Sequence, residues 1–197
     1  MGEARETVRR VLSVVGRIEQ VVVVLLVCLI VTTISAQVVS RYLFDRPIVW
    51  VEEVAVYAFI WSVFIGASLA LKHDRHLRIE TYVGRLPPRA QALARALVAL
   101  LMLALFLTLI PPLLAAIGIE MRRMTIALPI PVPIGWFFSV PLFVGVLSMT
   151  ATTLYRLWGE LSVVAGAPAA APIMPPISMM EEDEEAASER ALLGERP

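Results

Sequence analysis

The chain contains few of the residues that build disulfides, metal sites and charged active sites. Its 197 residues include one cysteine and two histidines, and only 17% are charged. Cys28 lies in an apolar run; a lone cysteine excludes an internal disulfide, and a small packing residue is the simpler interpretation. His73 and His76 are three positions apart, but a metal site would need further ligands. We therefore expect no metal and no other cofactor.

Charged residues are absent altogether from four long windows, residues 20–40, 54–71, 96–119 and 134–155. At about 1.5 Å per residue these windows form helices of roughly 27 to 36 Å, enough to cross a hydrocarbon core of about 30 Å. The chain is 58% hydrophobic with a mean hydropathy of +0.78, which exceeds the range of soluble domains. The sequence predicts an all-α integral membrane protein with four transmembrane helices in a lipid bilayer.

The empty windows also exclude several kinds of function. Ion-coupled carriers, proton relays and haem sites place ionisable residues within the membrane, despite a cost of about 2.5–3.5 kcal/mol each. The sequence has no Gly-rich phosphate loop, and no nucleophile and base share a face. We expect neither catalytic residues nor nucleic-acid binding, so the protein should not be an enzyme. Glu19 lies at the edge of the first window beside Arg17, and we interpret it as hydrated.

Lysine and arginine are distributed unevenly between the two sides of the predicted membrane domain. Eleven lie near the spans before the first, between the second and third, and after the fourth, whereas four lie in the other two connections. Positive charge favours the cytoplasmic side. Both termini are therefore expected in the cytoplasm, in a multi-pass protein of the bacterial inner membrane. The first apolar run is longer than that of a signal peptide, which favours a retained anchor.

Three segments follow from these patterns. Residues 1–17 should form a cytoplasmic amphipathic segment, with Val8, Val11, Leu12 and Val15 on one face, as in short interfacial helices along a headgroup layer. A weaker pattern of this kind occurs at residues 79–86. Residues 18–158 hold the four spans. Residues 159–197 are rich in Pro and Ala and then acidic, which predicts a disordered cytoplasmic tail.

Two periodic patterns indicate helix packing. Small residues recur every fourth position at Ala58, Ser62, Gly66 and Ala70, which lets another helix approach closely. Polar residues recur at the same spacing at Thr33, Gln37 and Arg41. Both patterns predict helix seams, and we expect another polypeptide to complete part of such a seam.

The stretch RYLFDRPIVWVEE at residues 41–53 resembles the signature of the small permease subunit of TRAP (tripartite ATP-independent periplasmic) transporters. The similarity continues after this stretch and covers roughly residues 10–158. Asp45 stands where asparagine is common in that family. The matching positions singled out here are Arg41, Tyr42, Phe44, Pro47, Trp50, Glu52, Glu53, Trp61, Gly66 and His76.

The resemblance implies a role in secondary transport. A large permease subunit and a periplasmic substrate-binding protein would be the partners, and a sodium or proton gradient would drive symport of organic anions such as C4-dicarboxylates. The solute site would belong to the large subunit, and this chain would act as a scaffold. Two alternatives stay open: a stand-alone four-span exporter or adaptor, and the analogous small subunit of a tripartite tricarboxylate transporter.

Physical roles can be assigned to part of the signature. Glu52 and Glu53 should open the second helix, where free N–H groups and the helix dipole favour negative charge. Trp50 should lie at the membrane–water boundary. Arg41 either pairs with Glu52 or Glu53 across the first hairpin, or these residues cap and anchor the two helix ends independently.

Overall fold

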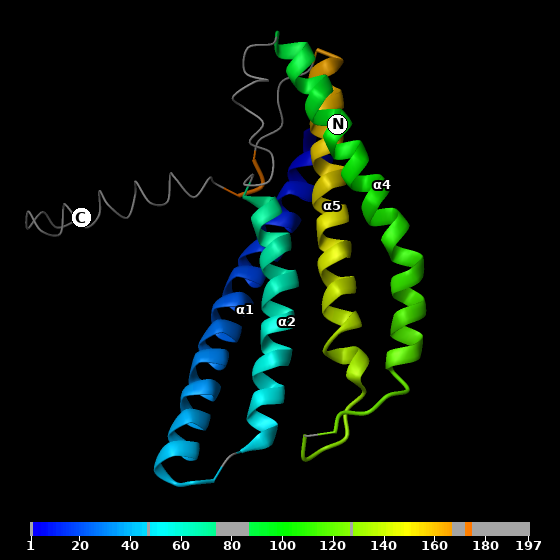
Figure 1. Cartoon of the computed structure of the whole chain (residues 1–197). Coiled ribbons are helices and arrows are strands. Elements are labelled where there is room, and N and C mark those ends of the chain that lie inside the picture. Colours follow the sequence, from blue (N-terminus) through cyan, green and yellow to red (C-terminus); the bar gives the residue numbers. More distant parts are fainter. Residues whose placement is uncertain (1, 47, 74–86, 127, 167–171, 175–197) are drawn as a thin grey trace, which may run out of the picture.

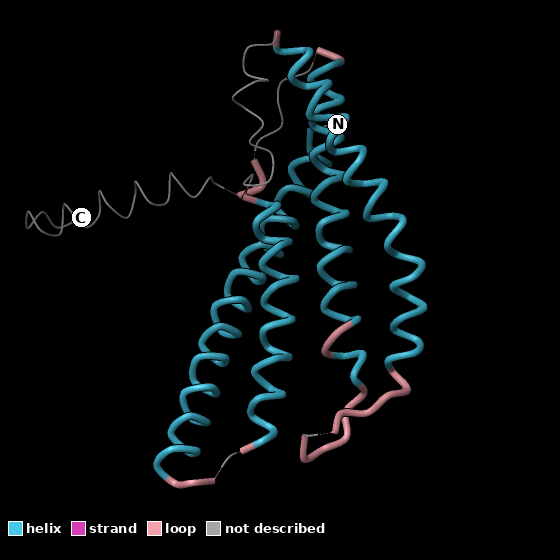
Figure 2. The backbone as a smooth tube through the Cα atoms, in the orientation of Figure 1, coloured by secondary structure: helices cyan, strands magenta, loops and turns pink. Residues whose placement is uncertain are grey.

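The computed structural model describes residues 2–46, 48–73, 87–126, 128–166 and 172–174. Its elements are the α-helices α1 (Gly2–Leu43), α2 (Val49–Lys72), α4 (Pro88–Glu120) and α5 (Ser139–Val164), with a 3-10 helix η1 (Ile134–Trp136). Within the described ranges, helices joined by loops make up the chain and no strand is assigned (Figure 2). Four helical segments are long and apolar enough to cross a membrane, which confirms the predicted four-span, all-α fold.

The helices pack as a row in which α1 contacts α2, α2 contacts α5, and α5 contacts α4. Figure 1 shows α1 and α4 at the two edges of this row. We call the end that holds the N-terminus and the last turn of α5 the terminal end. The opposite end, with the α1–α2 turn and the α4–α5 connection, is the loop end. Because α1 is an edge helix, only 6% of its apolar window is buried, against 33% for α2.

Two contacts hold the centre of the row. Gly145 of α5 lies so close to α2 that an added Cβ would be 3.1 Å from the carbonyl oxygen of Phe64. Next to it, an apolar cluster joins α2, α4 and α5 through Leu71, Phe106 and Val146. The predicted small-residue stripe contributes less within this chain. Ala58 is buried, but a Cβ added at Gly66 would meet no atom within 4 Å.

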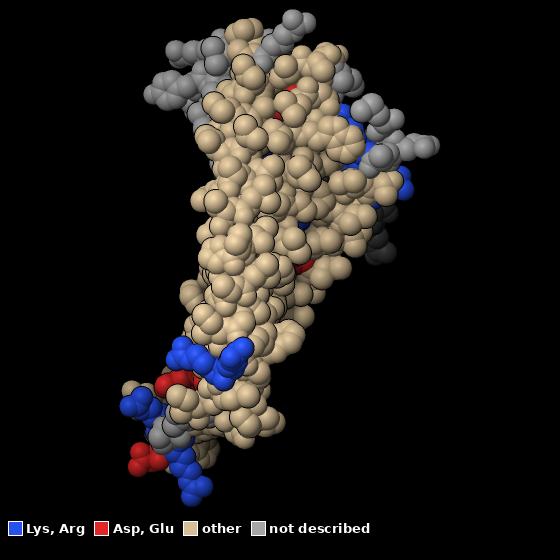
Figure 3. Space-filling model, turned by 90° about the vertical axis from the view of Figure 1, so that its right-hand side faces the viewer, with Lys and Arg blue, Asp and Glu red and all other residues tan. Residues whose placement is uncertain are grey.

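The surface matches a membrane protein. Figure 3 shows a broad band with few charged side chains, and Lys, Arg, Asp and Glu gather at the lower end of that view. The exposed residues of α1 and α4 within the band are mostly valine, leucine and isoleucine. In the absence of other protein, these faces would lie against lipid, where their exposure carries no hydrophobic cost.

The N-terminal segment continues directly into the first span. Residues 1–17 were expected to form an amphipathic segment along the headgroup layer, and α1 runs unbroken from Gly2 to Leu43 over 42 residues. Leu12, on the predicted apolar face, is buried against Tyr155 of α5 and Met174. Protein packing therefore uses part of the face that was assigned to the headgroup layer. The weaker pattern at 79–86 lies outside the described residues.

The fourth span begins at Ile134, where the charge-free window 134–155 begins, but its first residues are not part of the long helix α5. It begins with η1, whose Gly135 packs on the end of α4: an added Cβ would lie 3.2 Å from the backbone nitrogen of Met121. α5 begins at Ser139. Pro141 is its third residue, where the backbone N–H has no partner in the helix and proline is tolerated. The Ser139 hydroxyl donates to Glu120 and ties α5 to the last residue of α4.

The tail prediction needs a correction at its start. The helix α5 continues through residues 159–164, which were assigned to the tail. Ile173 and Met174 are buried against Leu12 and Tyr155. Two apolar side chains in a Pro-rich stretch are enough to fix this short segment on the bundle. The acidic run lies outside the described residues.

The backbone conformation of the α1–α2 turn explains why a short polar residue, Asp45, stands at this position. Asp45 has a φ of 52°, in the left-handed region where Asn, Asp and Gly are favoured over other residues. Around it, the Arg46 N–H donates to the Ser40 carbonyl, and the Ser40 hydroxyl donates back to the Arg46 carbonyl. A short polar side chain at position 45 therefore meets a backbone requirement of the turn.

Candidate functional site

The signature residues lie at the loop end, where Glu52 joins α1 to α2. Glu52 is in the first turn of α2, as predicted. It accepts a hydrogen bond of 2.5 Å from the side-chain amide of Gln37 on α1. Gln37 is 8% exposed, so its amide would otherwise be buried without this acceptor. The predicted polar stripe on α1 therefore does face α2 at Gln37.

The neighbouring Glu53 joins α2 to the α4–α5 connection by way of Tyr57. The Tyr57 hydroxyl donates to Glu53. The Tyr57 ring stacks on Phe137, with centroids 4.0 Å apart, and meets Phe138 edge-on at 5.8 Å. The side chain of Tyr57 is buried, and its polar tip has a partner, as buried tyrosines require. Because Phe137 follows η1, the Glu53 side of α2 holds the loop that leads into α5.

A second contact strengthens this junction. The Trp61 indole N–H donates to the carbonyl oxygen of Trp136, the last residue of η1, at 3.2 Å. Two aromatic side chains, Tyr57 and the signature residue Trp61, thus fix the α4–α5 connection on α2. The sequence suggested neither contact, because the partners are about 75 residues away along the chain.

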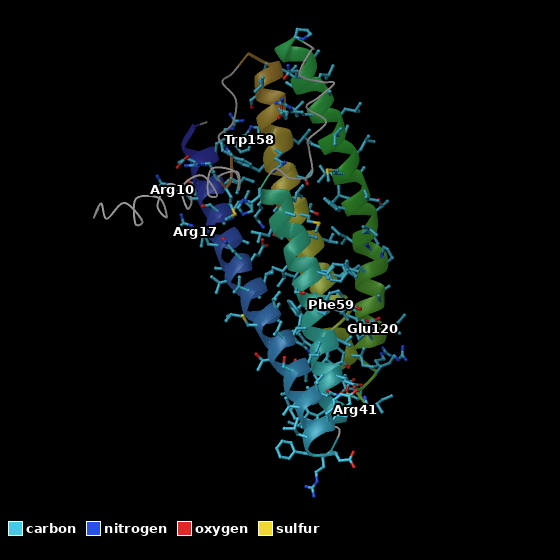
Figure 4. All side chains as sticks on the ribbon, turned by 60° about the vertical axis from the view of Figure 1, so that its left-hand side comes forward. Arg10, Arg17, Arg41, Phe59, Glu120 and Trp158 are labelled. Carbon is cyan, nitrogen blue, oxygen red and sulfur yellow. The ribbon has the colours of Figure 1, made fainter. Side chains whose placement is uncertain are left out.

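Within the described ranges, Arg41 forms an ion pair with neither Glu52 nor Glu53. Glu52 is bound by Gln37 instead, and the Glu53 carboxylate receives the Tyr57 hydroxyl. The Arg41 side chain lies at the loop end (Figure 4) and lines a groove between α1 and α2. The groove has a volume of about 510 Å³. Its lining residues are Ile30, Ile34, Gln37, Val38, Arg41, Tyr42, Glu52, Ala55, Val56 and Phe59.

The remaining signature residues do not converge on one point. Tyr42 and Phe44 are 78% and 67% exposed at the end of α1, and Trp50 is partly exposed at the start of α2. Such exposed aromatic side chains at a helix end suit a membrane–water boundary. Pro47 and His76 lie outside the described residues. We call Arg41, Glu52 and Glu53 the loop-end cluster, together with the partners Gln37 and Tyr57. The sequence placed the three charged residues near this turn and did not resolve their pairings.

A polar cluster at the opposite end was missed. Lys72 is fully buried at the end of α2, and its ammonium group lies 2.6 Å from Glu19 of α1. The same group donates to Ser68 at 3.1 Å and to Ser148 of α5 at 2.7 Å. Ser148 in turn donates to Glu19 at 2.7 Å. We call these four residues the polar knot; they join α1, α2 and α5.

The polar knot corrects the interpretation of Glu19, whose side chain is only 12% exposed and paired rather than hydrated. The three N–H bonds of Lys72 each have an acceptor, which is the condition for burying an ammonium group at tolerable cost. The clue in the sequence was indirect. Lys72 follows its window immediately and Ser68 precedes it by one helical turn, but nothing in the sequence showed that Glu19 and Ser148 face them.

Other contacts close the terminal end around the polar knot. The Arg156 side chain donates to the Leu71 carbonyl at the end of α2. A positive charge is stabilising there, close to the last free carbonyls of the helix. The Arg5 guanidinium lies 5.4 Å from the ring centroid of Trp158, which is labelled in Figure 4 with Arg10 and Arg17 at the same end. These contacts are structural. Each uses a charged side chain to join helices.

The chain is similar to known transporter components. A family profile described as "Tripartite ATP-independent periplasmic transporters, DctQ component" matches residues 30–163. This range includes the loop-end cluster, the α4–α5 connection and, from the polar knot, Ser68, Lys72 and Ser148. The matched range is more than half of the chain.

Individual relatives are similar over shorter stretches. The chain is 39% identical over 66 residues to a Haemophilus influenzae protein named as a TRAP transporter small permease, a stretch that covers 34% of this chain and 41% of the relative. It is 27% identical over 79 residues to the sialic acid TRAP transporter small permease protein SiaQ of Vibrio cholerae, covering 40% and 46%. It is 30% identical over 66 residues to the sialic acid TRAP transporter permease protein SiaT of Haemophilus influenzae, covering 34% and 11%.

These matches span less than half of each relative, whereas the family profile spans both hairpins of the bundle. The family is a transporter component and not an enzyme, in agreement with the sequence prediction. With four helices able to cross a membrane, the protein is a multi-pass membrane component. The chain belongs to the DctQ component family of the tripartite ATP-independent periplasmic transporters.

Proposed function

We propose that this protein is the small, scaffolding membrane subunit of a secondary uptake system for carboxylated organic anions. The family match over residues 30–163 carries this proposal. Relatives named for sialic acid and for C4-dicarboxylate support a carboxylated solute. A sodium or proton gradient would drive the transport.

The ionisable groups of the bundle support a scaffolding role. Lys72 and Glu19 neutralise each other and share their remaining hydrogen bonds with Ser68 and Ser148. Glu52 and Glu53 accept bonds from Gln37 and Tyr57. Groups that are already bound to one another within the fold stabilise it, whereas a coupling-ion or solute site needs ligands that can be released. We therefore assign the solute and ion sites to another subunit.

The partner that we propose is a large permease subunit, aided by a periplasmic substrate-binding protein. The match to SiaT covers only 11% of that relative, so most of that permease has no counterpart in this chain. A separate large subunit would supply the missing part. The open side of Gly66 on α2, where an added Cβ meets no atom within 4 Å, is one place where a helix of that subunit can approach closely.

For the topology, we propose that the terminal end faces the cytoplasm and the loop end the periplasm, in the inner membrane. The positive-charge asymmetry favours this orientation. Reporter fusions after Arg10, Arg85 and Glu195 should be active as cytoplasmic reporters, and fusions at Arg46 and Arg123 as periplasmic ones. A periplasmic signal at Arg85 would reverse the assignment.

The functional proposal is tested by reconstitution. The purified chain in liposomes should take up no sialic acid or C4-dicarboxylate under a sodium or proton gradient. Uptake should appear when its large permease subunit and the loaded binding protein are added. Matched liposomes that hold the large permease and binding protein alone show how much of the uptake depends on this chain. Robust transport by the chain alone would overturn the proposal.

A further inference from the structure

The groove between α1 and α2 at the loop end is apolar along its length and polar at one end only. Its apolar lining comes from α1 residues such as Ile30 and Ile34 and from Val56 and Phe59 of α2. The three polar groups, Gln37, Arg41 and Glu52, all lie toward the α1–α2 turn. This arrangement matches an amphiphile whose head lies at the membrane boundary.

The length of the groove fits half of a bilayer. From Ile30 to Arg41 the helix rises about 16 Å, at about 1.5 Å per residue. From the start of α2 to Phe59 the rise is about 15 Å by the same measure. One leaflet of a hydrocarbon core of about 30 Å has this thickness. The groove therefore has the length of a ligand that occupies a single leaflet.

Arg41 supplies the charge that such a ligand would meet. Gln37 and Glu52 are bonded to each other at 2.5 Å, and within the described ranges Arg41 is ion-paired with neither glutamate. Arg41 lines the groove at its polar end, toward the α1–α2 turn. A guanidinium presents a planar fork of donors that matches the oxygens of a phosphate group.

We propose that this groove binds an acyl chain of a glycerophospholipid whose phosphate pairs with Arg41. The chain would lie on Ile34, Val38, Val56 and Phe59, four side chains that are about half exposed in the isolated subunit. The lipid covers them and gives the guanidinium a counter-charge, since Arg41 forms no ion pair within the part of the chain that the structure describes. The bound lipid then becomes part of the outer surface of the α1–α2 hairpin.

The experiment is native mass spectrometry of the full-length chain, delipidated in detergent and titrated with phosphatidylglycerol. Diacylglycerol with the same acyl chains is the control ligand, since it lacks only the phosphate headgroup. One phosphatidylglycerol should bind more tightly than diacylglycerol. Arg41→Gln should weaken phosphatidylglycerol binding about tenfold, equivalent to about 1.4 kcal/mol, and leave diacylglycerol binding unchanged. Arg41→Lys keeps the charge and should retain most of the affinity.

Two further variants locate the site. Arg46→Gln removes an exposed arginine from the same turn, outside the groove lining, and should bind lipid like the wild type. Val56→Trp fills the groove and should weaken the binding of both lipids. Equal affinity for the two lipids, an effect of Arg46→Gln as large as that of Arg41→Gln, or unchanged binding in Val56→Trp would each overturn the proposal.

The same groove could instead receive protein, and cross-linking distinguishes this case. Val56→Cys in a Cys28→Ala background places one thiol in the groove. In membranes that also contain the large permease, this thiol should form no disulfide with single cysteines placed in that subunit or with a second copy of the chain. An efficient cross-link to either one would assign the groove to a protein contact and overturn the lipid proposal.

Discussion

The two ends of the bundle hold their charged groups in different ways. At the terminal end, Lys72 and Glu19 are buried together, and two serines complete their hydrogen bonds. At the loop end, Glu52 is bound by a neutral amide, and Arg41 stays at the rim of an apolar groove. At the terminal end the charged groups of Lys72 and Glu19 are thus bound to each other. At the loop end, the proposed partner of Arg41 lies outside the chain. The comparison separates residues that maintain the fold from residues that meet the surroundings.

The largest effect should come from breaking the polar knot. Replacing Lys72 with Met leaves Glu19 buried beside two serines without its counter-ion, and a buried pair broken on one side costs about 3–5 kcal/mol. Thermal unfolding of the purified chain in detergent should show this loss. Adding Glu19→Gln should recover part of it, because the unpaired charge is then removed.

Arg95 and Glu160 supply the matched control for that variant. Their side chains are 45% and 24% exposed and 3.9 Å apart, and such a pair contributes about 0–1 kcal/mol. Arg95→Gln should therefore unfold close to the wild type. If Lys72→Met were as mild as this control, the contrast between the two ends would disappear.

An intermediate effect is expected where α5 crosses α2. Gly145→Ala places a methyl group 3.1 Å from the Phe64 carbonyl oxygen, so α2 and α5 must move apart slightly. We expect this overpacking to cost about 1–3 kcal/mol, which outweighs the gain of about 1 kcal/mol from the helix propensity of alanine. Gly66→Ala is the control on α2, because its new methyl meets no atom within 4 Å and alanine favours a helix by about 1 kcal/mol. In unfolding measurements on the isolated chain, Gly145→Ala should lower the stability and Gly66→Ala should raise it. Loss of stability in both variants would mean that the Gly66 face is already filled within the chain.

The smallest effect should distinguish the pairings at the loop end. In double-mutant cycles, Gln37→Leu and Glu52→Ala should be coupled by about 1 kcal/mol, because their side chains are hydrogen-bonded and partly buried. Arg41→Ala and Glu52→Ala should be additive to within about 0.3–0.5 kcal/mol. Coupling of the second pair and additivity of the first would restore the Arg41–Glu52 bridge that the sequence allowed.

The sequence predicted those features that depend on local composition. Four charge-free windows gave four spans, and Glu52 begins α2 because acidic residues favour a helix N-terminus. Features that depend on contacts between distant segments were missed. Glu19 was interpreted from its neighbour Arg17, but its partner is 53 positions away. The fourth span begins at Ile134 as predicted, but the 3-10 helix before α5 was not distinguished, because it carries no charge and lies within the same window.

The loop-end cluster falls between these cases. The RYLFDRPIVWVEE stretch placed Arg41, Glu52 and Glu53 at the first hairpin, and the structure agrees. The choice of partner depended on side-chain reach. Gln37 lies one helical turn before Arg41 and is buried, and it reaches Glu52, whereas Arg41 lines the groove. The spacing placed Gln37 and Arg41 on the same stripe of α1 and could not show which of them binds Glu52.

The polar knot has a consequence for biosynthesis. Glu19 and Lys72 both belong to the first hairpin, whereas Ser148 belongs to the last helix. The two charges can neutralise each other as soon as α2 has left the ribosome, before α5 exists. The lysine then still lacks one acceptor, which Ser148 supplies when α5 enters the membrane. Completion of the last helix thus gives α5 a specific docking point on a hairpin that is already inserted.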